Sequence, residues 1–388
     1  MMHQARKLGE VCQVLTGGTP SRTKLEYFGG GIPWVKITDM RQGMVVSTDE
    51  SLTAAGIENS SAKLMPSGTV LISIFATIGR TAVLGIEAAT NQAIAGVVPK
   101  DNAQLDSQYL RYFLDSQHGE LNRVARGVAQ PNINQGILKD LDVPLPPIAE
   151  QRRIVDILSC AEGIVRLRRE AEKKVAELIP ALFLDMFGDP ATNPKGWPTA
   201  PIVEFCAVQT GGTPSRDNPS YYDGTIPWVK TGEVAGGLIL KTEEHISAQA
   251  LNETNCKKFP VGTILVAMYG QGQTRGRCAV LGIEASTNQA CAAILPSERI
   301  AGEFLFRLLQ TQYEHLRSLA QGGNQANLNL SMIKNYRVIV PPISKQNEFV
   351  ERVNAVSSIQ FQQATATATA QATFDSLLSQ VFHAKGIL

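Results

Sequence analysis

The sequence predicts an α+β protein of two similar domains, each followed by a long helix. Three observations predict this class: an internal repeat of domain size, short β-type runs mixed with short helices inside each copy, and a long helical pattern that closes each copy. The 388 residues are enough for two or three domains with sizeable cores.

The internal repeat has a period near 195 residues. The segment TGGTPSR begins at Thr16 and again at Thr210, and IPWVK begins at Ile32 and again at Ile226. The segments AVLGIEA and TNQA and a Pro-Pro-Ile triplet then recur in the same order, at offsets of 194 to 197 residues. This period is far longer than that of solenoid repeats, so each copy must be a domain-sized unit. The chain as a whole therefore has an internal pseudo-two-fold duplication.

Each copy opens with about 145 residues that are rich in Gly, Pro, Asn and short apolar runs. GTVLISI from Gly68 and GTILVAM from Gly262 are typical of buried strands, and IPWVKIT from Ile32 predicts another strand. QYLRYFLDS from Gln108 and EFLFRLLQT from Glu303 predict short helices. This mixture indicates an α+β domain with much irregular loop.

A long helix is predicted after the proline break that ends at Pro147, and another after Pro342. Apolar residues recur there near a 3.5-residue spacing, and each apolar position of the first helix has an apolar counterpart 195 residues later. The charged middle of the first helix and the small, neutral middle of the second indicate helices that pack partly on each other and partly on something else. Pro180 should kink the first helix near its end, whereas Asp375 stands at the matching position of the second. The residues expected to pack are Ile154, Leu158, Ile179, Leu182, Phe349, Val353, Phe374 and Leu377.

These patterns place the domain boundaries. The first domain is expected at residues 1–145, the first long helix at 146–196, the second domain at 197–340 and the second long helix at 341–388.

Composition limits the class of protein. The net charge of +1 argues against non-specific coating of nucleic acid, but not against a sequence reader, because charge can be local and partner subunits can supply phosphate contacts. The six cysteines form no CxxC pair and no His has zinc-finger spacing, so free thiols and no metal site are expected. No apolar run reaches the roughly 18–20 residues that span a bilayer. The first residues also lack an apolar signal-peptide core. We therefore expect a cytoplasmic protein without membrane contact.

The TGGTPSR and IPWVK segments carry candidate nucleic-acid contacts. Paired glycines permit positive φ and close backbone approach, and the hydroxyls and Arg can bind phosphate or base edges, although a structural turn is the alternative. Trp34 and Trp228 are more typical of core anchors than of base-stacking platforms. Lys36 and Lys230 alternate with them along the strand and are candidates for DNA contact.

The most informative segment is the loop MYGQGQTRGR, residues 268–277, whose counterpart IFATIGR, residues 74–80, is three residues shorter. Gln and Arg make bidentate contacts to adenine and guanine in the major groove, and glycines would let the loop enter a groove. A flexible, solvated loop is the alternative, and the likeness to a phosphate-binding glycine loop is weak. The segments AQPNIN from Ala129 and NQANLN from Asn324 either read bases or cap the following helix.

The candidate DNA-contacting residues come from these four segments in both copies. In the first copy they are Thr16, Thr19, Ser21, Arg22, Lys36, Arg80, Gln130 and Asn132. In the second copy they are Thr210, Thr213, Ser215, Arg216, Lys230, Gln271, Gln273, Arg275, Arg277 and Gln325.

Motifs of catalytic sites do not occur. The sequence has no Walker A, HExxH or GxSxG motif and no Asn- or Asp-Pro-Pro-aromatic tetrapeptide of the kind that amino-methyltransferases use. The five histidines are scattered and suggest no triad. We therefore expect no catalytic residue, no metal ligand and no cofactor in this chain.

The duplicated order of these motifs resembles the specificity subunits of type I restriction-modification systems. The residues that carry the resemblance are PPIAEQRRIVDIL from Pro146, PPISKQNEFVERV from Pro341, and the GGTP and IPWVK segments of both copies. It covers essentially the whole chain. The resemblance implies that each domain is a target-recognition domain and that the two long helices pair antiparallel as a spacer. The polar middle of the first helix departs from an uninterrupted coiled coil.

The resemblance also implies partners. The subunit would bind double-stranded DNA with a bipartite target, two methyltransferase subunits that methylate adenine with S-adenosylmethionine, and two ATP- and Mg-dependent motor-nuclease subunits. Three alternatives stay open: a self-contained nuclease or methyltransferase with an atypical site, a specificity module of another restriction-type system, and a scaffold that does not touch DNA. An assay of the pure chain tests the first alternative, and the identity of the co-purifying subunit tests the second. Salt-dependent binding to a defined site would exclude the third.

Overall fold

The structure is a computed structural model, which describes residues 5–40, 43–75, 77–125, 132–270, 273–320 and 327–383. The chain divides into two compact units. Unit 1 comprises Met1–Arg169 and Thr365–Leu388, and unit 2 comprises Glu170–Ala364. Each unit therefore combines one domain with parts of both long helices.

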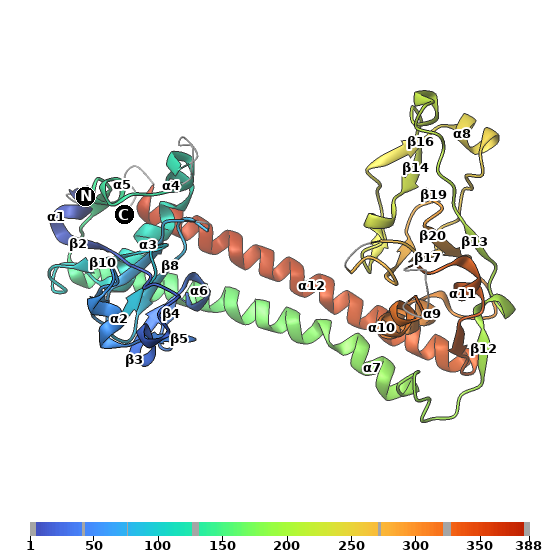
Figure 1. Ribbon diagram of the computed structural model, residues 1–388, viewed down its shortest axis with the longest axis horizontal. Helices are drawn as coiled ribbons and strands as arrows, with labels where there is room; N and C mark the ends of the chain where they lie inside the picture. Colours follow the sequence, from blue (N-terminus) through green and yellow to red (C-terminus); the bar gives the residue numbers. More distant parts are fainter. Residues whose placement is uncertain are drawn as a thin grey trace. The chain divides into compact units, whose positions relative to one another are not determined.

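A five-stranded sheet forms the centre of unit 1 (Figure 1). Its neighbours are antiparallel, except that β4 pairs with β8 in parallel. Strands β7 and β8 are buried along their whole length, which explains the continuous apolar run of the sequence. The helix α3 (Ser107–Ser116) packs on these two strands, and Asp106 caps its N-terminus. In order, the strands are β2 (Cys12–Thr16), β10 (Ile94–Pro99), β7 (Val70–Ser73), β8 (Thr81–Leu84) and β4 (Met44–Val45).

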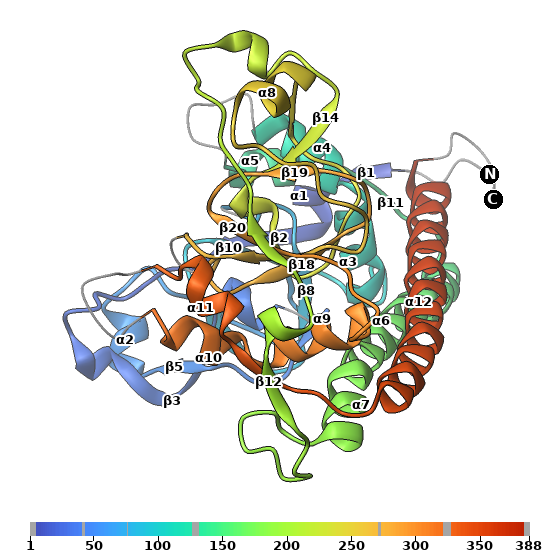
Figure 2. The ribbon, with the colours of Figure 1, turned by 90° about the vertical axis from the view of Figure 1, so that its right-hand side faces the viewer.

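A second sheet of unit 1 has the strand order β5-β3-β9-β6. With α2 (Ala54–Glu58) beside it, β3 and β5 form a small lobe in both views (Figures 1 and 2). The strands are β5 (Glu50–Leu52), β3 (Phe28–Val35), β9 (Ala88–Thr90) and β6 (Leu64–Met65). The remaining elements are the pair β1 (Ala5–Lys7) and β11 (Asp142–Pro144) and the helices α1 (Leu8–Val11), α4 (His118–Ala125) and α5 (Gln135–Lys139).

Unit 2 repeats this topology, except that its second sheet has three strands where that of unit 1 has four, and the place of β6 is taken by an isolated bridge between Phe259 and Ala285. Its five-stranded sheet consists of β13 (Val208–Thr210), β20 (Cys291–Ile294), β17 (Ile264–Ala267), β18 (Cys278–Leu281) and β15 (Leu238–Ile239). Its smaller sheets are β16 (Glu244–Ile246), β14 (Ile226–Val229) and β19 (Ser286–Thr287), and the pair β12 (Thr199–Pro201) and β21 (Arg337–Ile339). Its short helices are α8 (Ala248–Glu253), α9 (Gly302–Thr311), α10 (Tyr313–Ser318) and α11 (Leu330–Lys334). The repeat in the sequence is therefore a duplicated fold.

Two long helical segments follow the domains. The first is divided into α6 (Ile148–Ala176) and α7 (Leu178–Phe187), whereas α12 (Ile343–Phe382) is continuous over 40 residues. Pro180 explains the division, because its ring lacks an N–H and clashes with the carbonyl of Ala176, four residues earlier. The predicted kink near the end of the first helix is confirmed.

Both long helices pack on the core of each unit. In unit 1, Ile154 and Leu158 of α6 lie in the core, and Phe374 and Leu377 of α12 are half-buried against it. The start of one helix and the end of the other thus meet on the same core, so within this unit the helices run antiparallel. The predicted fold class of duplicated α+β domains joined by antiparallel helices is confirmed.

Both long helices contribute to the core of unit 2 in the same way. Ile179 of α7 and Phe349 and Val353 of α12 lie in it, and Leu182 packs against it half-buried. The rings of Phe183, Phe187, Phe304 and Phe349 lie with centroids 4.8–6.4 Å apart. Such aromatic pairs add stability beyond their buried area. Among the described residues, no helix has the length and hydropathy needed to cross a membrane.

Candidate nucleic-acid interface

The paired glycines of TGGTPSR pack against the TNQA turn in both units. The Gly18 N–H donates to the Thr90 carbonyl and the Gly212 N–H donates to the Thr287 carbonyl, each at 2.9 Å. A Cβ atom on Gly17 would lie 2.2 Å from the Asn91 carbonyl oxygen. None of these glycines has positive φ. They are needed because two segments of the chain touch there, so the positive φ that the sequence permits is not used.

The threonine that follows each glycine pair fixes a glutamine of the TNQA turn. The Thr19 hydroxyl donates to the Gln92 side-chain oxygen, and the Thr213 hydroxyl donates to that of Gln289. Thr16 and Thr210 end β2 and β13, and Thr16 accepts a long hydrogen bond of 3.4 Å from Gln135. Gln92 and Gln289 were not among the predicted site residues, although the repeated TNQA segment was a signal that could have found them.

In unit 1 the Arg of TGGTPSR and the Lys of IPWVK share one carboxylate. Arg22 lies 2.7 Å and Lys36 2.8 Å from the two oxygens of Glu50. The Arg22 guanidinium also covers the ring of Trp34, at 5.0 Å from its centroid. Trp34 is buried, and its indole N–H donates to the Gly18 carbonyl at 3.1 Å. The tryptophan is thus a core anchor that positions an exposed cation.

Unit 2 contains the same arrangement with one further acid. Arg216 lies 2.7 Å from Glu244 and covers the rings of Tyr222 and Trp228. Lys230 lies 3.1 Å from Glu244 and 2.8 Å from Glu243. Two cations therefore share one carboxylate in unit 1, whereas in unit 2 the lysine pairs with a second carboxylate as well.

These ion pairs keep their groups charged near neutral pH. The hydrogen bond to Glu50 raises the pKa of Lys36, and the hydrogen bonds from Arg22 and Lys36 lower the pKa of Glu50. Hydrogen bonds to Glu243 and Glu244 raise the pKa of Lys230. The side chains of Arg22 and Lys36 are 55% and 27% exposed, so both cations lie at the surface while they pair with Glu50.

The loop between β17 and β18 is braced rather than freely solvated in its described part. The Tyr313 hydroxyl of α10 donates to the Gln273 carbonyl at 2.6 Å, and Arg277 donates to the Gln273 side-chain oxygen at 2.7 Å. Gly276 has φ +84° and ends the loop, as Gly79 with φ +85° ends the loop between β7 and β8. Arg275 is half-buried, and Arg80 is exposed, with its guanidinium 3.5 Å from the Ile37 carbonyl. Gln271 lies outside the described residues.

The asparagine-rich segments join the same region. Asn134 and Asn329 cap α5 and α11, accepting from backbone N–H groups at 3.0 and 2.9 Å. Of the predicted residues in these segments, Asn132 is half-buried, and Gln130 and Gln325 lie outside the described residues. Ser21 and Ser215 form hydrogen bonds within their turns, to Thr23 and Asp217.

In each unit these contacts bring the repeated segments together at the end of the five-stranded sheet. We call each assembly the motif cluster. It consists of the described parts of 16–22, 34–36, 74–80, 90–93 and 132–135 in unit 1, and of 210–216, 228–230, 268–277, 287–290 and 327–329 in unit 2. Segments that are distant in sequence thus lie together in each unit.

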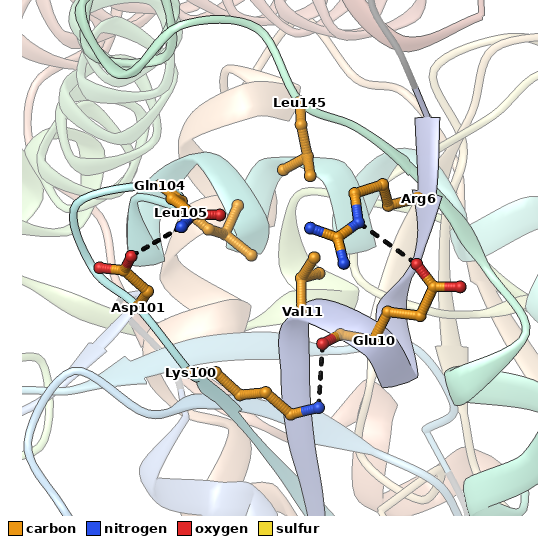
Figure 3. A pocket seen from close by; sticks show the side chains of 8 residues that line it. All are labelled: Arg6, Glu10, Val11, Lys100, Asp101, Gln104, Leu105 and Leu145. Carbon is orange, nitrogen blue, oxygen red and sulfur yellow. Dashed lines mark hydrogen bonds and ion pairs between the residues drawn. The ribbon is translucent and has the colours of Figure 1, made fainter.

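A small pocket in unit 1 is separate from the repeated motifs. It has a volume of about 130 Å³ and is lined by Arg6, Glu10, Val11, Lys100, Asp101, Gln104, Leu105 and Leu145 (Figure 3). The two cations that line it already have partners: Arg6 forms an ion pair with Glu10 at 3.2 Å, and Lys100 donates to the Glu10 carbonyl at 2.9 Å. In the part of the chain that the structure describes, no group of three or more His, Cys, Asp or Glu side chains can hold a metal ion.

Comparison with known proteins identifies the family. The model of the type I restriction modification DNA specificity domain matches residues 3–177 and again 194–368. The chain is 23% identical over 357 residues to the type I restriction enzyme MjaIX specificity subunit of Methanocaldococcus jannaschii, covering 87% of this chain and 82% of that protein. It is 32% identical over 176 residues to the EcoR124I/EcoR124II specificity subunit of Escherichia coli, covering 42% of this chain and 43% of that protein.

Solved structures share the fold. One is a chain from work on complex assembly and conformational transition of the type I R-M system, with a TM-score of 0.67 at 20% identity, covering 98% of this chain and 97% of that chain. Another is the type I restriction-modification S subunit from M. genitalium, with a TM-score of 0.57 at 14% identity, covering 99% and 96%. Since the two family matches account for most of the sequence and coincide with the duplicated fold, the chain belongs to the family of type I restriction modification specificity subunits with DNA-recognition domains.

Proposed function

We propose that the chain reads a bipartite DNA target, with one half-site for each motif cluster and a non-specific gap between them. The observation that carries the proposal is the duplication of the cluster, down to the shared carboxylate of its Arg and Lys. A reader with two equivalent surfaces recognises two separated half-sites, as dimeric readers do with two subunits. Arg22, Lys36 and their counterparts supply phosphate contacts, and the loops before β8 and β18 supply base contacts.

The chemistry belongs to partners in this proposal. Two methyltransferase subunits use S-adenosylmethionine to methylate adenine, and two restriction subunits use ATP and Mg to cleave DNA. This chain supplies no catalytic residue and no cofactor site. The naming of its relatives as specificity subunits supports this division of labour, as does a structural neighbour studied for the assembly of the type I complex.

The long helices offer a surface for the methyltransferase subunits. Ile157, Ile164 and Leu167 of α6 are 46%, 48% and 58% exposed, and their spacing puts them on one side of the helix. Ile359 of α12 is the counterpart of Ile164 and is 43% exposed. One such site on each long helix matches two copies of one partner. Ile164→Arg and Ile359→Arg should therefore each reduce the amount of methyltransferase that co-purifies.

The proposal is tested by exchanging one domain. Residues 197–340 would be replaced with those of a relative, and methylated adenines would be mapped in cells that also carry the partner subunits. We expect one half of the methylated motif to change and the other half to stay. A simultaneous change of both halves would refute one half-site per domain, and methylation or cleavage by the chain purified from every partner would refute the division of labour.

A further inference from the structure

We propose that Phe75 and Tyr269 are equivalent stacking residues that enter the base stack of the DNA, one in each half-site. This inference rests on the proposed function and adds residues that the sequence motifs did not single out. Phe75 follows β7 and Tyr269 follows β17, at the same place in the two loops of the motif clusters. Their side chains are 38% and 42% exposed.

The residue before each aromatic is held firmly and in the same way. The Ile74 N–H donates to the Ala93 carbonyl, and the Ile74 carbonyl accepts from the Ile133 N–H, at 2.8 and 3.2 Å. In unit 2 the Met268 N–H donates to the Ala290 carbonyl at 2.8 Å, and its carbonyl accepts from the Leu328 N–H at 3.0 Å. Both side chains are buried, Ile74 at 5% and Met268 at 2% exposure. The following aromatic ring is therefore presented from a fixed backbone.

The comparison of the two loops indicates what the ring does. The loops differ in length and in nearly all of their polar residues, as expected of segments that read different bases. They share the aromatic residue at the start and the Gly-Arg pair at the end. The shared parts must serve a purpose that does not depend on base sequence. Stacking on a base is such a purpose, because every base has a π-face.

The chemistry of the two rings points to stacking rather than to hydrogen bonding. Phe75 has no hydroxyl, so the property that it shares with Tyr269 is a flat, apolar ring. Such rings inserted between base steps unstack them and bend the duplex. An unstacked step also lowers the cost of moving a base out of the helix for modification by a partner. The end of each loop carries a cation, Arg80 or Arg277, that can hold the neighbouring phosphate.

The test uses the full chain with its partners and duplexes that the wild-type protein selects from a random library. 2-Aminopurine is placed at successive positions of each half-site, and its fluorescence reports unstacking. We expect Phe75→Ala to abolish the signal in one half-site only and Tyr269→Ala to abolish it in the other. Each variant should bind at least about fivefold more weakly.

Matched variants separate stacking from other roles. Phe75→Leu should fail like Phe75→Ala, whereas Phe75→Trp and Tyr269→Phe should keep both signal and affinity. Val46→Ala and Val261→Ala remove exposed apolar side chains outside the motif clusters and should change neither. Thermal unfolding of each variant checks that it folds.

The outcomes are distinguishable. If the wild-type chain selects no duplex, the proposed function fails. If it selects duplexes but Phe75→Ala and Tyr269→Ala bind and unstack them as the wild type does, only the stacking inference fails. Variants that bind DNA normally but lose the methyltransferase would show that the rings contact a protein, which also overturns the inference.

Discussion

Arg111 of α3 forms a two-point ion pair with Glu162 of α6, with N–O distances of 3.1 and 2.6 Å. The Arg111 side chain is only 5% exposed, and the Tyr112 hydroxyl donates to the same carboxylate at 2.9 Å. This contact joins the first domain to its long helix. The counterpart of Arg111 in unit 2 is Phe306, which is buried in an apolar core instead. At this position the two copies thus differ, with an ion pair in unit 1 and apolar packing in unit 2.

Replacing Glu162 should destabilise unit 1. Glu162→Gln leaves the nearly buried Arg111 with a weaker acceptor, and we expect a loss of about 1–2 kcal/mol in the free energy of unfolding. Urea unfolding of the full chain measures it. Glu351→Gln makes the same change at an exposed position of α12 and should have little effect. Equal unfolding midpoints for Glu162→Gln and the wild type would show that the pair does not contribute.

The carboxyl of Asp115, whose side chain is 24% exposed, should make the stability depend on pH. Burial raises the pKa of Asp115 to about 6, against the opposing effects of Arg111 and the Thr81 hydroxyl. Between pH 7 and pH 5 the folded chain therefore binds a proton that the unfolded chain, with the ordinary pKa of 3.8, does not bind. This proton uptake should raise the free energy of unfolding by about 1 kcal/mol as the pH falls.

Asp115→Asn removes this titration and isolates it from that of other groups. The difference in unfolding free energy between the wild type and Asp115→Asn, measured at several pH values, should shift in favour of the wild type as the pH falls from 7 to 5. A difference that is constant over this range would contradict the raised pKa.

The loop of unit 2 should determine part of one half-site. If Gln273 or Arg275 makes a bidentate base contact, its replacement by Ala should remove about 1–3 kcal/mol of discrimination at one base pair. Binding to a panel of single-base variants of the target measures this. Lys230→Ala is the control, because loss of a phosphate contact should weaken binding evenly across the panel and reduce the salt dependence. Unchanged preferences in both loop variants would leave Gln273 and Arg275 with a structural role.

The length of the helices should set the gap between the half-sites. Seven residues inserted in both α6 and α12 keep the apolar positions in register and lengthen each helix by about 10 Å, which corresponds to roughly three base pairs. The methylated motif of this variant should have a gap about three base pairs longer, although rotation of the far half-site around the duplex also weakens binding. Methylation with the original gap would refute helix length as the ruler.

The sequence by itself determined the duplication, the types of the main elements and the division of the first long helix. These features are local or collinear: a repeat is visible in the order of residues, a helix in its apolar spacing, and a break in the missing N–H of Pro180. Strands β7 and β17 and helices α3 and α9 formed where their patterns predicted them. The absence of catalytic motifs is likewise a property of the sequence alone.

Only the tertiary structure decided what the repeated motifs do. The TGGTPSR segment is a turn whose glycines allow it to contact the TNQA segment. Its Arg and the Lys of IPWVK form ion pairs with the same glutamate, which belongs to none of the motifs. The sequence of either loop alone also did not indicate that Phe75 and Tyr269 are exposed. Each of these relationships joins residues that are far apart in sequence, and their proximity depends on how the sheets pair and pack. Local propensity and spacing carry no information about such contacts, so only the folded structure shows them.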